Sequence, residues 1–210
     1  MAEKKPSIWN IRRYLPEEKD VNTVDKQGLT KIFQAAQKGK GSEMRTLIEK
    51  GADIDFQFQR VSESAYSLTN PLGTRPEFAE GSTPLHVAVI HGNIDAMKVL
   101  MDNGAKLSER DLDGCTPLDR ALEKYIKLDD EKTMSSPEEK QTRAVKKRDM
   151  EHTRYKVISK LLAKNGAEAH VFTMPEKLTA EVVKDDDIAL FTEDARAERK
   201  RRFPRIRIDF

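Results

Sequence analysis

The chain has 210 residues, the usual size of one domain, and 35% of them are charged, against about 25% in an average globular protein. Its 38 basic and 36 acidic residues leave a formal net charge of only +2, so overall charge identifies no class of partner. A single cysteine excludes an internal disulfide, and no apolar run approaches the ~20 residues of a membrane-spanning helix. Because the first residues also lack the apolar segment of a signal peptide, we expect a cytoplasmic protein, with the nucleus as the alternative.

Residues 1–22 are the first segment, and three apolar residues in it have helical spacing, namely Ile8, Ile11 and Leu15. Ser7 is a suitable N-cap for a helix at this place. We therefore expect an N-terminal arm that contains a short helix. A disordered leader is the alternative.

The next segment, residues 23–55, has the same frame as the more regular stretch 81–110, where two short helices are predicted. In that stretch Thr83 can cap a first helix, and Gly92 supplies a left-handed stop. A second helix begins at about Ile94 and ends at the following Asn-Gly pair. Neither helix is long enough to be stable alone in water, so each needs neighbours with matching apolar faces.

Residues 56–80 are an insertion between these two segments. The link from Gly51 to Thr83 is more than twice as long as the corresponding link from Gly104 to Thr116. We expect the added residues to form a finger-like loop that contacts a partner. The alternative is a passive surface loop, since long insertions cost little entropy.

Residues 111–170 contain a further copy of the pattern with a second insertion. The span from Thr116 to Gly166 is more than twice as long as the corresponding span from Thr83 to Gly104 in the regular stretch. We expect a helical insertion at about 127–152, as part of a long antiparallel helical hairpin that protrudes from the stack.

The charge of the chain reverses sharply near its end. Residues 171–194 are expected to form a C-terminal cap of one or two helices, and residues 195–210 form a basic tail with a net charge of +5. The final residues alternate polar with apolar, as in a strand that adds to the edge of a partner's sheet. A disordered tail, a nuclear import signal and a nucleic-acid patch are the alternatives.

The spacing of the repeated segments and their sequence motif together resemble a known repeat family. Thr83 and Thr116 begin two successive copies, and residues 81–86 read Gly-Ser-Thr-Pro-Leu-His. The spacing of the two threonines equals the repeat period of the ankyrin-repeat family, and the motif, with the Asn-Gly-Ala that follows the second helix, resembles the pattern of that family. The resemblance covers roughly residues 8–170. It implies an all-α solenoid of paired antiparallel helices with short β-hairpin loops, plus the long helical hairpin insertion in the third repeat.

The resemblance also divides the chain into three full repeats, at 23–55, 81–110 and 111–170, with degenerate caps. Residues 8–22 become a half-repeat that covers the exposed end of the stack. The match weakens outward, because the motif's Pro and His are replaced in the first copy and its His is replaced in the third.

In this family partners are recognised by the hairpin tips and the adjoining face of each first helix. The resemblance therefore implies a non-enzymatic protein-binding module: an adaptor, a scaffold or a stabilising subunit of a larger intracellular assembly. The implied partner-binding residues are Lys26, Gln27, Leu29, Gln37 and Lys38 in the first repeat; Glu80, Ser82, Ile90, His91 and Asn103 in the second; and Asp111, Leu112, Asp113, Cys115, Glu123 and Lys124 in the third. Of these, Ile90 and Leu112 are the apolar members, and an apolar anchor usually dominates an interface.

The sequence contains no motif that is typical of a catalytic site. The four histidines lack the spacing of a metal-binding helix pair, and no phosphate-binding glycine loop is present. His86 matches the histidine that in this family bonds to nearby backbone and braces one repeat against the next. We expect no catalytic residue, metal, cofactor, small-molecule substrate or membrane contact.

A second function class remains open, which is binding of nucleic acid or another polyanion through the helix 138–164 and the tail 196–207. Residues 138–164 hold nine Lys or Arg against four acidic residues. The alternative is a solvated helix face, as most charge runs are. Aromatic residues that could stack on bases are nearly absent there, which argues against single-stranded nucleic acid.

Overall fold

The computed structural model describes residues 20–25, 27–59, 77–133 and 143–175, together with residues 178 and 191. These ranges contain six α-helices and no β-strand. In chain order the helices are α2 (Lys31–Lys38), α3 (Gly41–Glu49), α5 (Pro84–Ile90), α6 (Ile94–Asp102), α7 (Pro117–Thr133) and α8 (Arg143–Lys164). The N-terminal arm, most of the first insertion and nearly all of the predicted C-terminal cap and tail lie outside the described residues.

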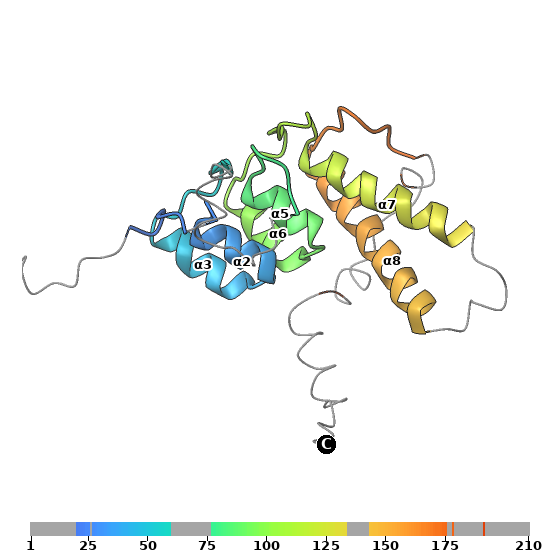
Figure 1. The fold of residues 1–210 in the computed structure, drawn as a ribbon, viewed down its shortest axis with the longest axis horizontal. Helices are drawn as coiled ribbons and strands as arrows, with labels where there is room; N and C mark the ends of the chain where they lie inside the picture. Colours follow the sequence, from blue (N-terminus) through green and yellow to red (C-terminus); the bar gives the residue numbers. More distant parts are fainter. Residues whose placement is uncertain are drawn as a thin grey trace, which may run out of the picture.

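The helices form three antiparallel pairs, α2–α3, α5–α6 and α7–α8, which stack in chain order (Figure 1). The central helix α5 contacts α2 on one side and α7 on the other, while α3 contacts α6. The predicted helical repeat solenoid is therefore confirmed. None of the described helices is long and apolar enough to span a membrane.

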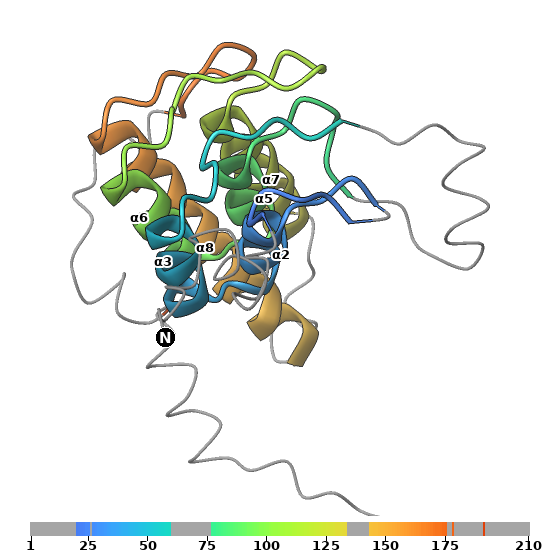
Figure 2. The ribbon, with the colours of Figure 1, turned by 90° about the vertical axis from the view of Figure 1, so that its left-hand side faces the viewer.

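The loops that enter and connect the pairs all lie at one end of the helices, as Figures 1 and 2 show. We call them fingers and number them in chain order: finger 1 is 20–25 with 27–30, finger 2 is 51–59 with 77–83, finger 3 is 104–116 and finger 4 is 165–172. The expected β-hairpins carry no strand assignment in the described residues. Their turns are held by a few backbone hydrogen bonds, such as the one from the N–H of Asp111 to the carbonyl of Cys115 at 3.0 Å, together with the side-chain contacts described below.

The boundaries of α5 follow from its first and last residues. Thr83 is in an extended conformation and forms a reciprocal capping box with His86, and a proline occupies the first turn. Gly92 ends the helix with a φ of +64°, a conformation that side chains disfavour. A Cβ added there would also lie 2.6 Å from Cδ of Arg154 in α8. The predicted cap and stop are both confirmed.

The third pair is much longer than the others. The helices α7 and α8 have 17 and 22 residues, whereas the other four have seven to nine. They continue past the stack as an antiparallel hairpin (Figure 1), which confirms the long helical hairpin predicted for the third repeat. The connection between them lies outside the described residues.

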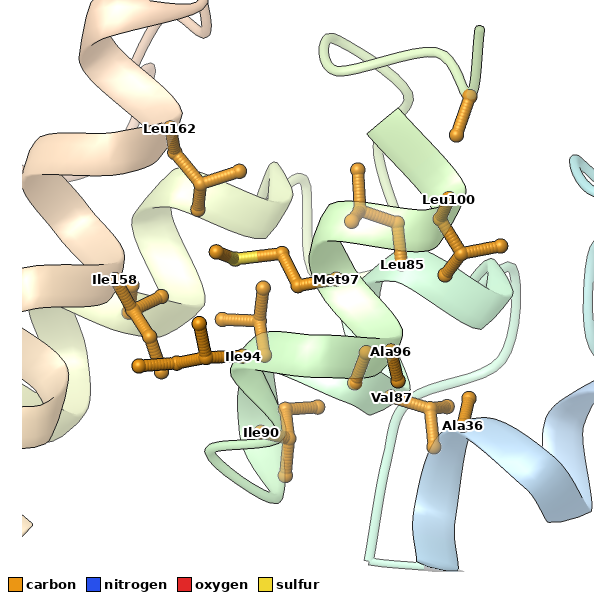
Figure 3. Packing of buried hydrophobic residues seen from close by; sticks show 14 of the residues in the cluster. Ala36, Leu85, Val87, Ile90, Ile94, Ala96, Met97, Leu100, Ile158 and Leu162 are labelled. Atoms are coloured by element: carbon orange, nitrogen blue, oxygen red, sulfur yellow. The ribbon is translucent and has the colours of Figure 1, made fainter. Parts of the chain in front are cut away.

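One apolar core runs through all three pairs. Figure 3 shows Ile94 and Met97 of α6 pointing toward Ile158 and Leu162 of α8. All four side chains are fully buried. Burial of each such side chain contributes roughly 1.5–3 kcal/mol, so stacking supplies the stability that helices of this length lack by themselves.

Candidate protein-binding surface

One position in the first turn of each leading helix attaches a repeat to the next finger. In α5 this residue is His86, whose Nδ1 accepts a hydrogen bond from the backbone N–H of Thr83 at 3.1 Å. The proton therefore sits on Nε2, which donates to the carbonyl of Cys115 in finger 3 at 3.1 Å. Burial lowers the pKa of His86, which keeps the ring neutral for both bonds. The predicted structural role of His86 is confirmed.

In α7 the same position is held by Asp119, and the direction of hydrogen bonding is reversed. Its carboxylate accepts from the backbone N–H of Thr116 at 2.9 Å and from the N–H groups of three consecutive finger 4 residues, each at 3.0 Å: His170, Val171 and Phe172. Burial alone would raise the pKa of Asp119, but these backbone donors outweigh it and lower the pKa. The aspartate thus replaces the histidine with an ionised acceptor.

In α2 the position is held by Phe33, which has no hydrogen-bonding group. Its ring centroid lies 6.0 Å from Phe56, 6.4 Å from Phe58 and 6.1 Å from Phe78, all in finger 2. Phe58 and Phe78 also meet edge to face at 5.1 Å. The two ends of the first insertion are therefore part of the core, and attachment here is apolar.

The tip of finger 3 is a tight turn built around Asp111. Its Oδ1 accepts from the backbone N–H of Asp113 at 3.1 Å and of Cys115 at 3.0 Å. Finger 1 repeats this construction with Asp25, whose Oδ1 accepts from the N–H groups of residues 27 and 29. These Asx-type bonds add to the backbone hydrogen bonds that close each turn, such as the one from the N–H of Gly114 to the carbonyl of Asp111 at 2.9 Å.

The same turn is tied to α7 by Arg120. Its guanidinium contacts three carboxylates: Asp111 at 2.7 Å, Glu123 at 3.1 Å, and Asp113. Although burial opposes the charged form, these hydrogen bonds raise the pKa of Arg120, so it is a permanent cation. The finger is thereby held in one orientation against the first helix of its repeat.

The predicted partner-binding residues fall into four groups by exposure. Exposed are Gln37, Lys38, Asn103, Leu112, Asp113 and Glu123. Half-buried are Gln27, Glu80, His91 and Lys124. Buried are Leu29, Ser82, Ile90, Asp111 and Cys115. Lys26 lies outside the described residues. Leu112 and Asp113 are neighbours at the tip of finger 3, and Arg120 links Asp113 to Glu123 of α7; the role of all three in binding stays a prediction.

The two predicted apolar anchors differ in what they present. Leu112 is 73% exposed, the largest value among the exposed large apolar residues of the described chain. Ile90 is only 9% exposed, and its carbonyl accepts a hydrogen bond from the Tyr155 hydroxyl of α8 at 2.6 Å. Burial raises the pKa of Tyr155 to about 12, so the hydroxyl keeps its proton. Ile90 therefore belongs to the packing between repeats and is not an exposed anchor.

Two exposed apolar residues were missed by the sequence reasoning. Val24 in finger 1 and Val171 in finger 4 are each 53% exposed. Hydrophobic periodicity gives no signal for them, because they lie in turns and not on a helix face.

Few other side chains in the described part of the chain could react, bind a metal ion or bind a polyanion. Cys115 is buried, and burial raises the pKa of its thiol. Among the described residues no three His, Cys, Asp or Glu side chains lie close enough together to hold a metal ion. On the basic helix α8, Lys146 and Lys147 are exposed, but Lys160 is buried.

Comparison with known proteins identifies similar chains. The family model for ankyrin repeats matches three copies, over residues 2–111 and 61–129. A mitochondrial disaggregase of Bos taurus is 30% identical over 165 residues, which cover 70% of this chain and 24% of the relative. A putative ankyrin repeat protein of Rickettsia bellii is 31% identical over 101 residues, 46% of this chain and 42% of the relative. An ankyrin repeat-containing protein of Schizosaccharomyces pombe is 44% identical over 48 residues, 22% of this chain and 23% of the relative. The chain thus spans less than half the length of each of these relatives.

Proposed function

The chain belongs to the ankyrin-repeat family, whose members are generally protein-interaction modules, and we propose that it is a non-enzymatic adaptor, scaffold or stabilising subunit of a larger intracellular assembly. In this proposal the partner binds the finger tips and the adjoining ends of the leading helices. The tip of finger 3 is the centre of the contact.

The observation that carries the proposal is the combination of exposure and rigidity at Leu112. Its side chain is 73% exposed, yet its backbone N–H donates to the carbonyl of Glu80 in finger 2 at 2.8 Å. The turn around it is fixed by Asp111, which is itself bound to Arg120. An apolar side chain on a preformed backbone loses little conformational entropy on binding, so it is well suited to anchor a partner.

The relatives support a module that works beside other activities. In the bovine disaggregase the matched region is about a quarter of the protein. We infer from this proportion that ankyrin repeats like these serve recognition within a larger chain or complex, while other parts carry out any chemistry.

The test is site-specific photo-crosslinking in a native extract, followed by mass spectrometry. A photoreactive amino acid at position 112 should capture a partner. The same amino acid at position 150 is the matched control and should capture none, because Met150 is also an exposed apolar residue but lies on α8, away from the proposed contact. In pull-downs with the purified partner, Leu112→Arg should abolish capture and Met150→Arg should retain it, with unchanged thermal melting for both. Equal capture by the two variants would remove finger 3 as the binding site.

Polyanion binding is a weaker candidate. Of the basic residues that were predicted to carry it, Lys160 is buried, and Lys147 lies 3.9 Å from Glu151 on the same helix. Retention of the chain on DNA or RNA at ~50 mM salt, with a steep loss at higher salt, is the result that would favour it.

A further inference from the structure

We propose that the surface around Leu112 binds a basic segment that carries an apolar side chain. This inference rests on the protein-binding function proposed above and adds the chemistry of the partner. Two features carry it: an exposed apolar anchor on finger 3, and carboxylates of finger 3 and α7 that share one largely buried cation.

The apolar anchor lies where two fingers touch. A Cβ added at Gly81 of finger 2 would be 3.3 Å from the backbone nitrogen of Leu112, so the two fingers are in van der Waals contact at this point. The hydrogen bond from Leu112 to Glu80 joins them as well. A partner that covers Leu112 therefore meets both fingers at once.

Near Leu112 the positive charge is largely buried, whereas two of the negative charges are exposed. Asp111, Asp113 and Glu123 share the guanidinium of Arg120, so three carboxylates face one cation and two negative charges remain. The side chain of Arg120 is only 14% exposed, whereas those of Asp113 and Glu123 are 63% and 47% exposed. The cation is thus covered, and the charge that solvent meets at this place is negative.

Local charge decides what a partner meets, although the whole chain has a net charge of +2. At physiological ionic strength charges are screened beyond about 8 Å, so distant lysines do not balance Asp113 and Glu123. The guanidinium of Arg110 in the same finger is directed toward finger 4, where its Nη2 lies 3.0 Å from Nδ1 of His170; this contact positions Arg110 without neutralising its charge.

The free energy needed to remove water from the carboxylates favours a partner with positive charge. Docking on Leu112 takes water away from Asp113 and Glu123, and a carboxylate that loses water without gaining a partner is destabilised. A neutral apolar segment would leave that cost unmet, and an acidic segment would add repulsion. Arginine or lysine beside an apolar side chain offsets the cost and accelerates association.

The experiment measures fluorescence anisotropy of labelled peptides mixed with the full chain. A short peptide that alternates arginine with leucine should bind. A glutamate–leucine peptide and an arginine–serine peptide should each bind at least about tenfold more weakly. The first lacks the positive charge, and the second lacks the apolar side chain. Equal binding of the glutamate–leucine peptide would overturn the proposal.

Variants localise the effect. The double variant Asp113→Asn/Glu123→Gln should weaken binding of the arginine–leucine peptide by about tenfold. The control Glu49→Gln/Asp102→Asn, which makes the same charge change at exposed carboxylates of α3 and α6, should not. Thermal melting of both variants checks the fold. Unchanged binding by the Asp113/Glu123 variant would contradict the proposal.

The same variants separate this inference from the broader function. If position 112 crosslinks a protein and the charge variant leaves that crosslink unchanged, the proposed chemistry is wrong and the protein-binding function stands. If position 112 crosslinks no protein, both are wrong.

Discussion

The first and third repeats attach to the next finger through opposite chemistry at the same helix position. In α2, Phe33 packs among three aromatic rings of finger 2. In α7, Asp119 accepts hydrogen bonds from consecutive backbone N–H groups of finger 4. The second repeat uses His86, which donates to a single carbonyl of finger 3. The common requirement is therefore attachment, and an aromatic ring, an imidazole and a carboxylate each meet it.

The apolar attachment of the first repeat coincides with the insertion in finger 2, whereas the other insertion lies between the two helices of the third repeat. Hydrogen bonds fix the position of a finger to within a few tenths of an ångström, whereas contacts among aromatic rings can be remade when the chain changes length. The inserted finger follows the apolar attachment. Phe78 stands five residues before Thr83, at the position that Asp25 and Asp111 occupy before their own repeats. The insertion thus supplies its own core residue in place of the turn-forming aspartate.

The largest effect is expected from removing the apolar attachment. Phe33→Ala should lower the free energy of unfolding by about 3–5 kcal/mol, because the buried ring leaves a cavity between three others. Phe33→Leu, which keeps most of the volume, should cost less than about 1.5 kcal/mol. Urea unfolding measures both. If Phe33→Ala is as stable as the parent protein, the ring does not hold finger 2.

Much of the second repeat could be predicted from the sequence, because its signals are local. The cap at Thr83, the stop at Gly92 and the start of the second helix depend on residues within a few positions of one another, whereas the role of His86, whose partner Cys115 is 29 residues away, followed from the family resemblance. The burial of Ile90 could not be predicted in this way, since it involves Tyr155, which is 65 residues away.

In the first and third repeats, departures from the family motif do not weaken the structure. Phe33 and Asp119 weaken the match to the family pattern, yet each carries the attachment that the histidine supplies elsewhere. A motif records one chemical solution, whereas the fold needs only a contact between a helix and the next finger. The resemblance placed Leu112 among the partner-binding residues, whereas its backbone hydrogen bond to Glu80 joins residues of two different fingers, which no local pattern encodes.

A smaller effect is expected from pH at the second repeat. Burial lowers the pKa of His86 below its ordinary value of 6.5, so the unfolded chain binds more protons than the folded chain once the pH falls below 6.5. The stability contributed by this group is complete above pH 6.5 and decreases as the solution is acidified. His86→Phe, which gives the second repeat the residue of the first, should flatten the dependence of unfolding free energy on pH by up to about 1.4 kcal/mol per pH unit.

The comparison of slopes isolates this histidine. Burial also lowers the pKa of His91, but that residue is present in both proteins and cancels. Urea unfolding at several values between about pH 5 and pH 7 gives the slopes. Identical slopes for the parent and His86→Phe would show that His86 takes up a proton in the folded chain as readily as in the unfolded chain, against the arrangement of its hydrogen bonds.

The smallest effects should come from the threonine that precedes each leading helix. The hydroxyl of Thr116 donates to Asp119 at 2.8 Å, and that of Thr83 lies 3.0 Å from Nδ1 of His86. The hydroxyl of Thr30 has no hydrogen-bond partner among the described residues, because the aromatic ring of Phe33 stands where an acceptor would be. Replacement by the isosteric valine should therefore cost about 1–2 kcal/mol at Thr116, about 1 kcal/mol at Thr83, and nothing measurable at Thr30. Equal losses at all three positions would mean that the hydroxyl acts through the helix cap alone, and that the residue at the attachment position has no part in it.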